Sequence, residues 1–304
     1  MNLSSITAPI VSRLAPTPSG YLHLGNAVNF VLTWLLTRRA GGTLHLRIDD
    51  LDRQRLRPAY LDNIFQTIEW LGLDYDHGPS GPEDFETNFS QLHHLGEYQQ
   101  LLDELRQVPD LLYACRCSRT DIQRAGGQHP DATCQAQRLP LDTPETAWRA
   151  HVPNGLTIEF QDLWQPQVAV PLAADIGDFV VRKKDGVAAY QIASVVDDIR
   201  LGTTLIVRGL DLLPSTAAQL WLASQAKCTA AFGHVQFAHH ALLPGADGEK
   251  LSKSTQASIQ RGIMAEAGSP RVVYATVARL LGLPDAAGES LATLSWGIPN
   301  RLSS

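Results

Sequence analysis

The chain lacks the features that would place it in or across a membrane. No stretch of its 304 residues comes near the roughly 18 uncharged apolar residues that a membrane-spanning helix requires. The first residues, MNLSSITAPIV, hold no basic segment followed by a long apolar one, so we expect no signal peptide. Cysteine is scarce too, and four unevenly spaced thiols are too few for a disulfide scaffold. These absences predict a cytoplasmic protein without membrane contact.

Positive charge is in deficit. Lys and Arg total 25 against 31 Asp and Glu, which gives a net charge of −6. Such a balance argues against a protein that coats nucleic acid without specificity. A local basic strip could still bind RNA, because binding depends on where the charge lies. With 44% hydrophobic and 18% charged residues, the composition is globular and suits one large or two modest domains.

Hydrophobic patterning predicts an α/β domain near the N-terminus. An apolar strand over 10–14 precedes a Pro/Gly-rich loop, a helix over 26–39 with arginines in its last turn, and an alternating strand over 43–48. Strand, helix and strand in this order form the βαβ unit that opens a parallel sheet. The later pattern predicts helices over 58–73, 91–107 and 214–227, a buried strand over 203–209, and a mostly helical tail after about 250.

The segment 179–196 contains two apolar runs joined through Asp185-Gly186, a pattern that predicts a β-hairpin. Asp197 and Asp198 follow the second run. We therefore expect these two carboxylates to end a strand at the mouth of a pocket.

Two polar loops far apart in the sequence carry the chemistry. The first, Arg13-Leu-Ala-Pro-Thr-Pro-Ser-Gly-Tyr-Leu-His23-Leu-Gly25-Asn26, brings His23 to a helix start, where backbone N–H groups and the helix dipole favour phosphate. The second, Gly248-Glu-Lys250-Leu-Ser-Lys253-Ser254, offers two ammonium groups to a triphosphate. Taken singly, the first is also typical of a tight turn with a capping histidine, and the second of a solvated surface loop.

Together and in this order, the loops resemble the HIGH and KMSKS motifs of class I aminoacyl-tRNA synthetases, with Leu251 in place of the methionine. The longer form R-x-A-P-[ST]-P-[ST]-G-x-L-H-[IL]-G is similar to the glutamyl branch. The resemblance implies a Rossmann-type parallel sheet with helices on both faces and ATP at its carboxyl edge. Three further stretches resemble the same branch: Arg47-Ile-Asp-Asp-Leu-Asp52, residues 189–198 (AYQIASVVDD) and residues 207–213 (VRGLDLL).

The resemblance also implies a domain organisation. Residues 1–245 would form the Rossmann-type catalytic domain, with an acceptor-like, zinc-binding insertion at about 108–190. Residues 246–304 would hold the KMSKS loop and a small helical, stem-contact-like subdomain. Fifty residues follow Ser254, too few for the anticodon-binding domains of a full glutamyl-tRNA synthetase, so none is expected. A short chain with a Cys-x-Cys…Cys cluster is similar to the glutamyl-Q tRNA(Asp) synthetases, and we expect a monomer.

That likeness implies an ATP-dependent ligase that activates L-glutamate to glutamyl-adenylate and transfers it to the queuosine base in the anticodon of tRNA(Asp). Two alternatives stay open. A short glutamyl-tRNA synthetase could charge a tRNA 3′ end, against which the missing C-terminal domain argues. A catalytically silent, synthetase-like protein could bind RNA, against which the intact His23, Gly25, Lys250 and Lys253 argue.

The same resemblance implies residue roles. His23 and Lys253 would stabilise phosphate charge as the glutamate carboxylate attacks ATP, with Mg²⁺ bridging pyrophosphate oxygens. Arg208 would pair with a glutamate carboxylate, because a guanidinium fork matches its geometry, and Asp49, where the family usually has Glu, would face the ammonium. The residues implied for glutamate are Arg13, Leu14, Ala15, Pro16, Thr17, Asp49, Tyr190 and Arg208, and those for ATP are His23, Gly25, Asn26, Lys250 and Lys253.

Three thiols gather in one segment. Cys115, Cys117 and Cys134 lie within twenty residues, and in a cytoplasmic chain such a cluster predicts metal binding before a disulfide. Thiolates and imidazole suit tetrahedral Zn²⁺. By the resemblance, His129 takes the place of a tyrosine in the family pattern, and we expect it as the fourth ligand, with Asp131 or a water as rivals. Three reduced structural cysteines without metal remain the alternative.

Overall fold

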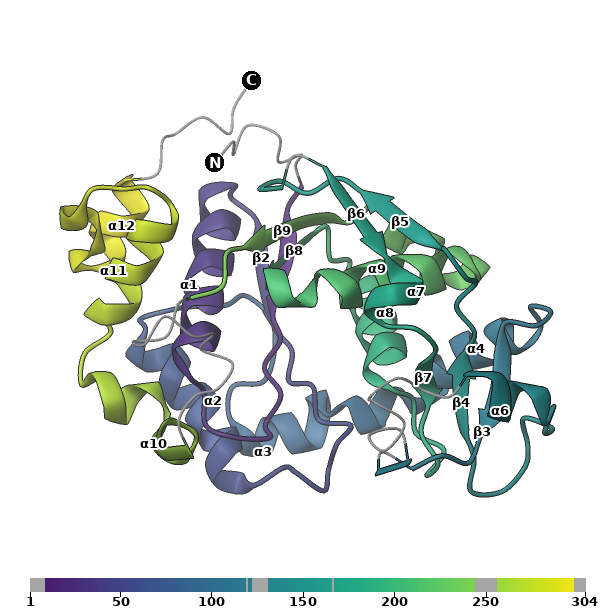
Figure 1. Ribbon diagram of the computed structural model, residues 1–304. Helices are drawn as coiled ribbons and strands as arrows, with labels where there is room; N and C mark the ends of the chain where they lie inside the picture. The colour runs from purple at the N-terminus through teal and green to yellow at the C-terminus, as the bar shows by residue number, and fades with distance from the viewer. Residues whose placement is uncertain (1–8, 119, 122–130, 166, 244–255, 298–304) are drawn as a thin grey trace.

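A parallel β-sheet forms the centre of the protein (Figure 1). The computed structural model describes residues 9–118, 120–121, 131–165, 167–243 and 256–297. Two parallel strand pairs build the sheet: β1 (Val11–Leu14) with β2 (Thr43–Leu46), and β8 (Leu205–Gly209) with β9 (Gln236–His240).

Hydrogen bonds between β1 and β8 join the two pairs. The Thr204 amide donates to the Val11 carbonyl at 2.8 Å, and the Ser12 hydroxyl donates to the Leu205 carbonyl at 2.8 Å. Single parallel bridges extend both edges, from His45 to His77 beside β2 and from Phe237 to Asp162 beside β9. The resulting spatial order is His77, β2, β1, β8, β9, Asp162.

Helices cover both faces of this sheet. In β8, Leu205 and Val207 join the core cluster that contains α1 (Leu24–Arg39), whereas Ile206 joins a cluster with α8 (Tyr190–Arg200) and α9 (Leu213–Ser224). Successive strand side chains point to opposite faces, and both faces are dry here. Burial on two sides explains why this strand is an uninterrupted apolar run.

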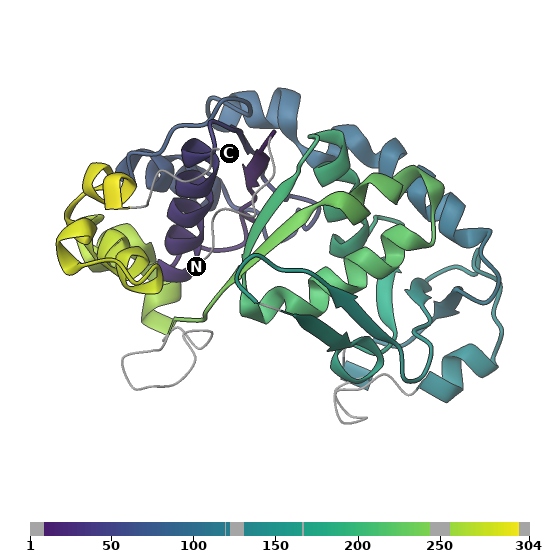
Figure 2. The ribbon, with the colours of Figure 1, turned by 90° about the horizontal axis from the view of Figure 1, so that it is seen from above.

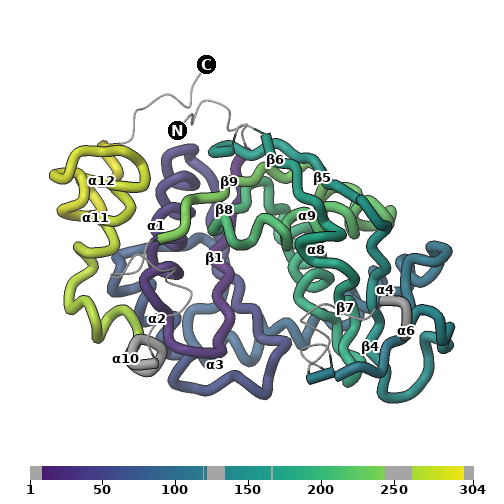
Figure 3. Tube along the Cα trace, viewed as in Figure 1, coloured from purple at the N-terminus to yellow at the C-terminus, as the bar shows by residue number. Residues whose placement is uncertain are grey.

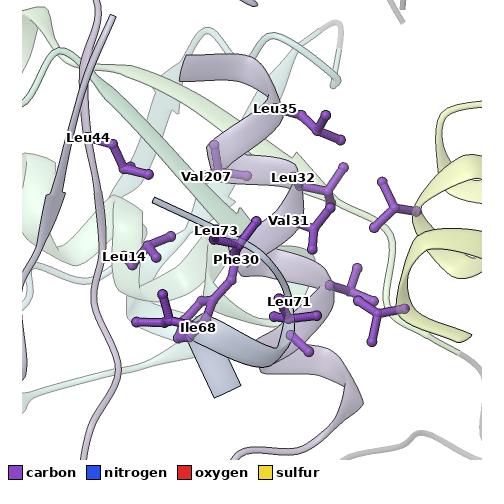
Figure 4. Packing of buried hydrophobic residues seen from close by; sticks show 14 of the residues in the cluster. Leu14, Phe30, Val31, Leu32, Leu35, Leu44, Ile68, Leu71, Leu73 and Val207 are labelled. Atoms are coloured by element: carbon purple, nitrogen blue, oxygen red, sulfur yellow. The ribbon is translucent and has the colours of Figure 1, made fainter. Parts of the chain in front are cut away.

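The C-terminal helices pack against α1. Figure 4 shows Val31 and Leu32 on the side of α1 toward α11 (Arg271–Leu280) and α12 (Leu291–Gly297). Val273 and Val277 of α11 are fully buried in the same cluster. Seen from above, these helices lie on the side of α1 away from β8 and β9 (Figure 2). The tail thus buries a face of α1 that the sheet leaves uncovered.

A kinked helix of this tail contacts the loop that follows β1. α10 (Gln256–Ala267) is broken at Gly262, whose φ of 69° suits glycine. There the Ile263 amide donates to the Leu22 carbonyl at 2.8 Å. A Cβ on Gly262 would lie 3.0 Å from the Cβ of Tyr21. The backbones therefore meet closely at this point.

A second, antiparallel sheet lies at the opposite end of the molecule from α11 and α12 (Figure 3). Its order is β3 (Leu112–Cys115), β4 (Ala147–Ala150) and β7 (Phe179–Arg182). A separate antiparallel pair joins β5 (Thr157–Phe160) to β6 (Val168–Pro171). The remaining elements are α2 (Pro58–Trp70), α3 (Pro82–Asp84), η2 (Phe85–Phe89), η3 (Gln91–His94), α4 (Leu95–Arg106), α6 (Asp131–Ala136), α7 (Leu172–Asp175), η4 (Leu210–Leu212), η5 (Lys227–His234) and η7 (Asp285–Glu289).

One predicted element is wrong. The turn at Asp185-Gly186 forms, with the Lys183 amide donating to the Val187 carbonyl at 2.8 Å, but the second apolar run is helix α8 rather than a strand. Asp197 and Asp198 accordingly lie inside this helix, fully buried, and do not end a strand. A helix buried on several sides gives the same short apolar run as a buried strand, so periodicity could not separate the two.

The opening strand, helix and strand are confirmed to within a few residues. Among the described residues, no helix is both long and apolar enough to cross a bilayer.

Candidate active site

A cavity of about 700 Å³ lies at the carboxyl edge of the parallel sheet. Arg13, Arg208 and His240 come from the ends of β1, β8 and β9, and Arg47 directly follows β2. Ligands of such sheets bind at this edge, where the loops diverge. The cavity wall includes most of the predicted residues: Arg13, Ala15, Pro16, Thr17, His23, Gly25, Asn26, Asp49, Tyr190 and Arg208.

Three of the residues predicted for glutamate or ATP are not placed on that wall: Leu14, Lys250 and Lys253. The side chain of Leu14 is fully buried in the hydrophobic core behind the cavity. Lys250 and Lys253, and the expected zinc ligand His129, lie outside the residues that the structure describes.

His23 caps the N-terminus of α1 with its side chain. The Gly25 amide donates to Nδ1 of His23 at 3.1 Å, and the His23 amide donates to Oδ1 of Asn26 at 3.1 Å. Because Nδ1 accepts, the proton of the neutral ring is on Nε2. Desolvation lowers the pKa of His23, against the opposing effect of Asp211 and Glu266. The site therefore holds a neutral imidazole that can donate from Nε2.

Gly25 makes room for this ring. A Cβ at position 25 would lie 3.0 Å from Cε1 and 3.1 Å from Nδ1 of His23, which is closer than ordinary van der Waals contact. The glycine therefore makes room for the His23 imidazole and also lines the cavity.

Three buried guanidinium groups surround Asp198. Its Oδ1 accepts from Nε of Arg13 at 2.7 Å and from Nη1 of Arg47 at 2.8 Å, and its Oδ2 lies 3.9 Å from Nη2 of Arg208. Burial alone would raise the pKa of Asp198, but the guanidinium groups outweigh it and hold that pKa below its ordinary value. One carboxylate thus neutralises part of a strongly positive cavity floor.

Asp49 is held by its own segment. Arg47 donates from Nε to Oδ1 at 2.7 Å and from Nη2 to Oδ2 at 3.1 Å, a bidentate pair between neighbouring residues. Burial raises the pKa of Asp49 although Arg47 opposes the rise. The carboxylate lies on the cavity wall, where a substrate ammonium could reach its remaining lone pairs.

Arg208 is anchored on one of its nitrogens. Nη1 donates to Oε1 of Gln219 at 2.6 Å and to Oγ1 of Thr216 at 3.1 Å. Nη2 has two long contacts, 3.5 Å to Oγ of Ser194 and 3.9 Å to Oδ2 of Asp198, and Nε has no hydrogen-bond partner among the described residues. These remaining donors could receive a carboxylate. Tyr190, 43% exposed at the start of α8, lies on the same wall.

Some residues of the site had no predicted role. Asp198 was expected at a strand end, and Arg47 was quoted only as part of a motif. Asp211 and His240 line the cavity as well and were not singled out for it. The available signal was the acidic pair Asp197-Asp198 after an apolar run, since a carboxylate in apolar surroundings usually has a buried cationic partner.

Three thiols converge at the end of β3, of which Cys115 is the last residue. Sγ atoms of Cys115, Cys117 and Cys134 all lie within 4.8 Å of one another, and Cys117 and Cys134 are 3.3 Å apart. Burial, together with the neighbouring thiols, raises the pKa of Cys117 to about 12. Three converging sulfur ligands suit Zn²⁺, which binds Cys as thiolate.

The family model for class I tRNA synthetases (E and Q), catalytic domain, matches residues 9–297. The chain belongs to this family and is a ligase of the aminoacyl-tRNA synthetase type.

Two curated relatives carry a more specific name. The Glutamyl-Q tRNA(Asp) synthetase of Nitratidesulfovibrio vulgaris is 37% identical over 297 residues, covering 91% of this chain and 88% of its own. That of Symbiobacterium thermophilum is 39% identical over 294 residues, and the match likewise covers 91% of this chain and 88% of its own. The solved glutamate-tRNA synthetase from Elizabethkingia anophelis has a TM-score of 0.75 at 23% identity and shares the fold. The match covers 96% of this chain but only 66% of that one.

Proposed function

We propose that this enzyme activates L-glutamate with ATP and transfers the glutamyl group to the queuosine base in the anticodon of tRNA(Asp). The observation that carries the proposal is a single cavity that holds the His23 imidazole, the Arg208 guanidinium and the Asp49 carboxylate. The names of the relatives support the choice of acceptor. ATP and tRNA are cytoplasmic substrates, and we assign the reaction to that compartment.

In the proposed first step, the α-carboxylate of glutamate attacks the α-phosphate of ATP and pyrophosphate leaves. The Nε2–H of His23 would donate to a phosphate oxygen as charge develops there, while the helix dipole of α1 acts in the same direction. Lys250 and Lys253 are proposed to act on the same phosphates. Mg²⁺, when bound with ATP, neutralises part of the pyrophosphate charge.

Recognition of glutamate is assigned to the cavity floor. The Nη2 and Nε hydrogens of Arg208 would form the paired hydrogen bonds to the side-chain carboxylate. The Asp49 carboxylate would accept from the substrate ammonium, held in place by Arg47. An acidic amino acid is favoured because the two carboxylates, Asp198 and Asp49, neutralise only part of the charge of the three guanidinium groups.

We further propose that Cys115, Cys117 and Cys134 hold a structural Zn²⁺, with His129 as the fourth ligand. The converging thiols support three of these ligands. The metal would fix α6 to the end of β3. Zinc would have no part in the chemical step.

The decisive experiment measures the transfer of labelled glutamate by the enzyme to purified tRNA. We expect ATP-dependent labelling of tRNA(Asp) that contains queuosine and none of tRNA(Asp) that lacks it. Nuclease digestion should place the label on the anticodon nucleoside. His23→Ala should lower the rate by about 10²–10³-fold, the typical cost of losing one preorganised donor.

Other results would contradict the proposal in distinct ways. Label on the terminal adenosine of tRNA(Glu) would identify a short glutamyl-tRNA synthetase. Absence of glutamate-dependent exchange between ATP and pyrophosphate in the unmodified enzyme would identify a catalytically silent protein.

A further inference from the structure

A buried chain of hydrogen bonds leads from the edge of the central sheet to Arg208. Oδ2 of Asp162 lies 2.6 Å from Nδ1 of His239, and Nε2 of His239 lies 2.9 Å from Oγ1 of Thr216. Oγ1 of Thr216 in turn receives Nη1 of Arg208 at 3.1 Å. The chain crosses from the edge of the sheet through β9 to α9 and then to β8.

The direction of these bonds is determined from the Arg208 end. A guanidinium only donates, so Thr216 accepts from Arg208 and uses its own proton toward Nε2 of His239. His239 then carries its proton on Nδ1 and donates it to Asp162. Each donor meets one acceptor, and reversing any bond would leave a buried group unpaired.

Asp162 is fixed firmly enough to anchor the chain. Its Oδ1 accepts from the amides of Trp164 at 2.8 Å and Gln165 at 3.0 Å, and its Oδ2 accepts from the His239 amide at 3.1 Å. The side chains of Asp162 and His239 are fully buried. A flexible carboxylate could not hold the imidazole in one orientation, whereas this one is held by backbone on both oxygens.

The imidazole is also held by its packing. The His239 ring stacks on Phe237 with centroids 6.1 Å apart and planes at 20°, and it contacts Phe160 at 6.1 Å. Thr216 and Gln219 are fully buried on α9. Of the four residues in this series of hydrogen bonds, Arg208 lines the cavity and Asp162, His239 and Thr216 do not. These three therefore act on a ligand in the cavity through Arg208.

We propose that Asp162, His239 and Thr216 are positioning residues that fix the Nη1 side of the Arg208 guanidinium and thereby orient its Nη2 and Nε hydrogens toward the substrate carboxylate. This proposal rests on the proposed binding of glutamate in the cavity. An arginine has many rotamers, and a bidentate bond to a carboxylate requires one of them. Without Thr216, Nη1 would keep only its bond to Gln219, and the long contacts of Nη2 to Ser194 and Asp198 would let the guanidinium pivot about that bond.

The test compares two substitutions of Thr216. Thr216→Val keeps the shape but removes the hydroxyl, and Thr216→Ser keeps the hydroxyl. In glutamate-dependent exchange between ATP and pyrophosphate, we expect Thr216→Val to raise the KM for glutamate about 10-fold, typical of a lost bond to a charged group, and to leave the KM for ATP unchanged. Thr216→Ser should restore most of the affinity.

Thr229→Val is the matched control. Thr229 is a buried threonine whose hydroxyl donates to the Ala223 and Ala226 carbonyls, and it does not line the cavity. The Thr229→Val variant should have a lower thermal stability than the unmodified enzyme and the same KM for glutamate. A KM effect at Thr229 equal to that at Thr216 would overturn the proposal, since both would then reflect general loosening.

His239→Asn provides a second, independent test. The amide can still donate to Asp162, but it does not reach Thr216. We call the hydrogen-bonded series Asp162, His239, Thr216 and Arg208 the relay. If the relay acts as a unit, the double variant His239→Asn/Thr216→Val should raise the KM for glutamate no more than Thr216→Val alone. Additive effects, or an unchanged KM in Thr216→Val, would overturn the relay while leaving the proposed function intact. An unmodified enzyme without glutamate-dependent exchange would overturn both.

Discussion

Replacement of Gly25 by alanine should separate catalysis from stability. The added Cβ would lie 3.0 Å from Cε1 of the His23 ring, where carbon atoms normally stay about 3.5–4.0 Å apart. The ring must therefore retreat by about 0.5 Å or more. That retreat stretches the bond between the Gly25 amide and Nδ1, now 3.1 Å, beyond hydrogen-bonding range at about 3.6 Å.

Two effects on stability then nearly cancel. Loss of the N-cap bond costs about 0.5–2 kcal/mol, and alanine in place of a helical glycine contributes about 1 kcal/mol in the opposite direction. We expect the free energy of unfolding to change by less than about 1 kcal/mol for that reason. The displaced His23 donor should lower kcat/KM for exchange between ATP and pyrophosphate by about 10–100-fold, because catalytic donors tolerate little misplacement.

Gly96→Ala is the matched control. Gly96 lies in α4, and a Cβ there meets no atom within 4 Å. This variant should gain up to about 1 kcal/mol in stability and keep full activity. In a His23→Ala background, Gly25→Ala should cause little further loss of activity, since there is then no imidazole for the added Cβ to displace. Full activity of Gly25→Ala, or an equal loss in both backgrounds, would refute the reasoning.

Three further predictions follow from the cavity floor, the cap and the thiol cluster. Asp198→Asn leaves buried guanidinium groups without their counter-ion and should lower the free energy of unfolding in urea by about 3–5 kcal/mol; a loss below about 1 kcal/mol would contradict the assigned role. Because desolvation lowers the pKa of His23, its NMR titration midpoint should lie below the ordinary 6.5, and its contribution to the free energy of unfolding should fall as the pH drops from 6.5 toward that midpoint; a higher midpoint would contradict the neutral cap. Cys117→Ser should reduce bound zinc, measured by elemental analysis, from about one ion per chain toward none, and unchanged stoichiometry would exclude this thiol as a ligand.

Local signals were enough to predict the start of the fold. Apolar spacing and Gly/Pro breaks located the first strand, the helix that became α1 and the second strand, because each element buries a regular face. The helix α8 was missed because it is enclosed: Ile192, Ala193 and Val195 are all buried, and this density of apolar residues matches either structure.

Most of the glutamate and ATP residues predicted from motif resemblance lie on the cavity wall, while the way in which its charges pair was not predicted. The ion pairs of Asp198 with Arg13 and Arg47 join residues more than 150 positions apart in the sequence. The link from Asp162 to His239 spans 77 positions. Such pairings depend on how strands are ordered in the sheet, and residue type alone does not specify that order.

The most direct test of the account is a crystal structure with a non-hydrolysable analogue of glutamyl-adenylate. We predict that the analogue occupies the cavity at the carboxyl edge of the sheet, with its phosphate-like group within hydrogen-bonding distance of Nε2 of His23. Its side-chain carboxylate should accept from Nη2 or Nε of Arg208. An analogue bound elsewhere, or bound in the cavity with Arg208 still contacting protein groups alone, would contradict the central claim.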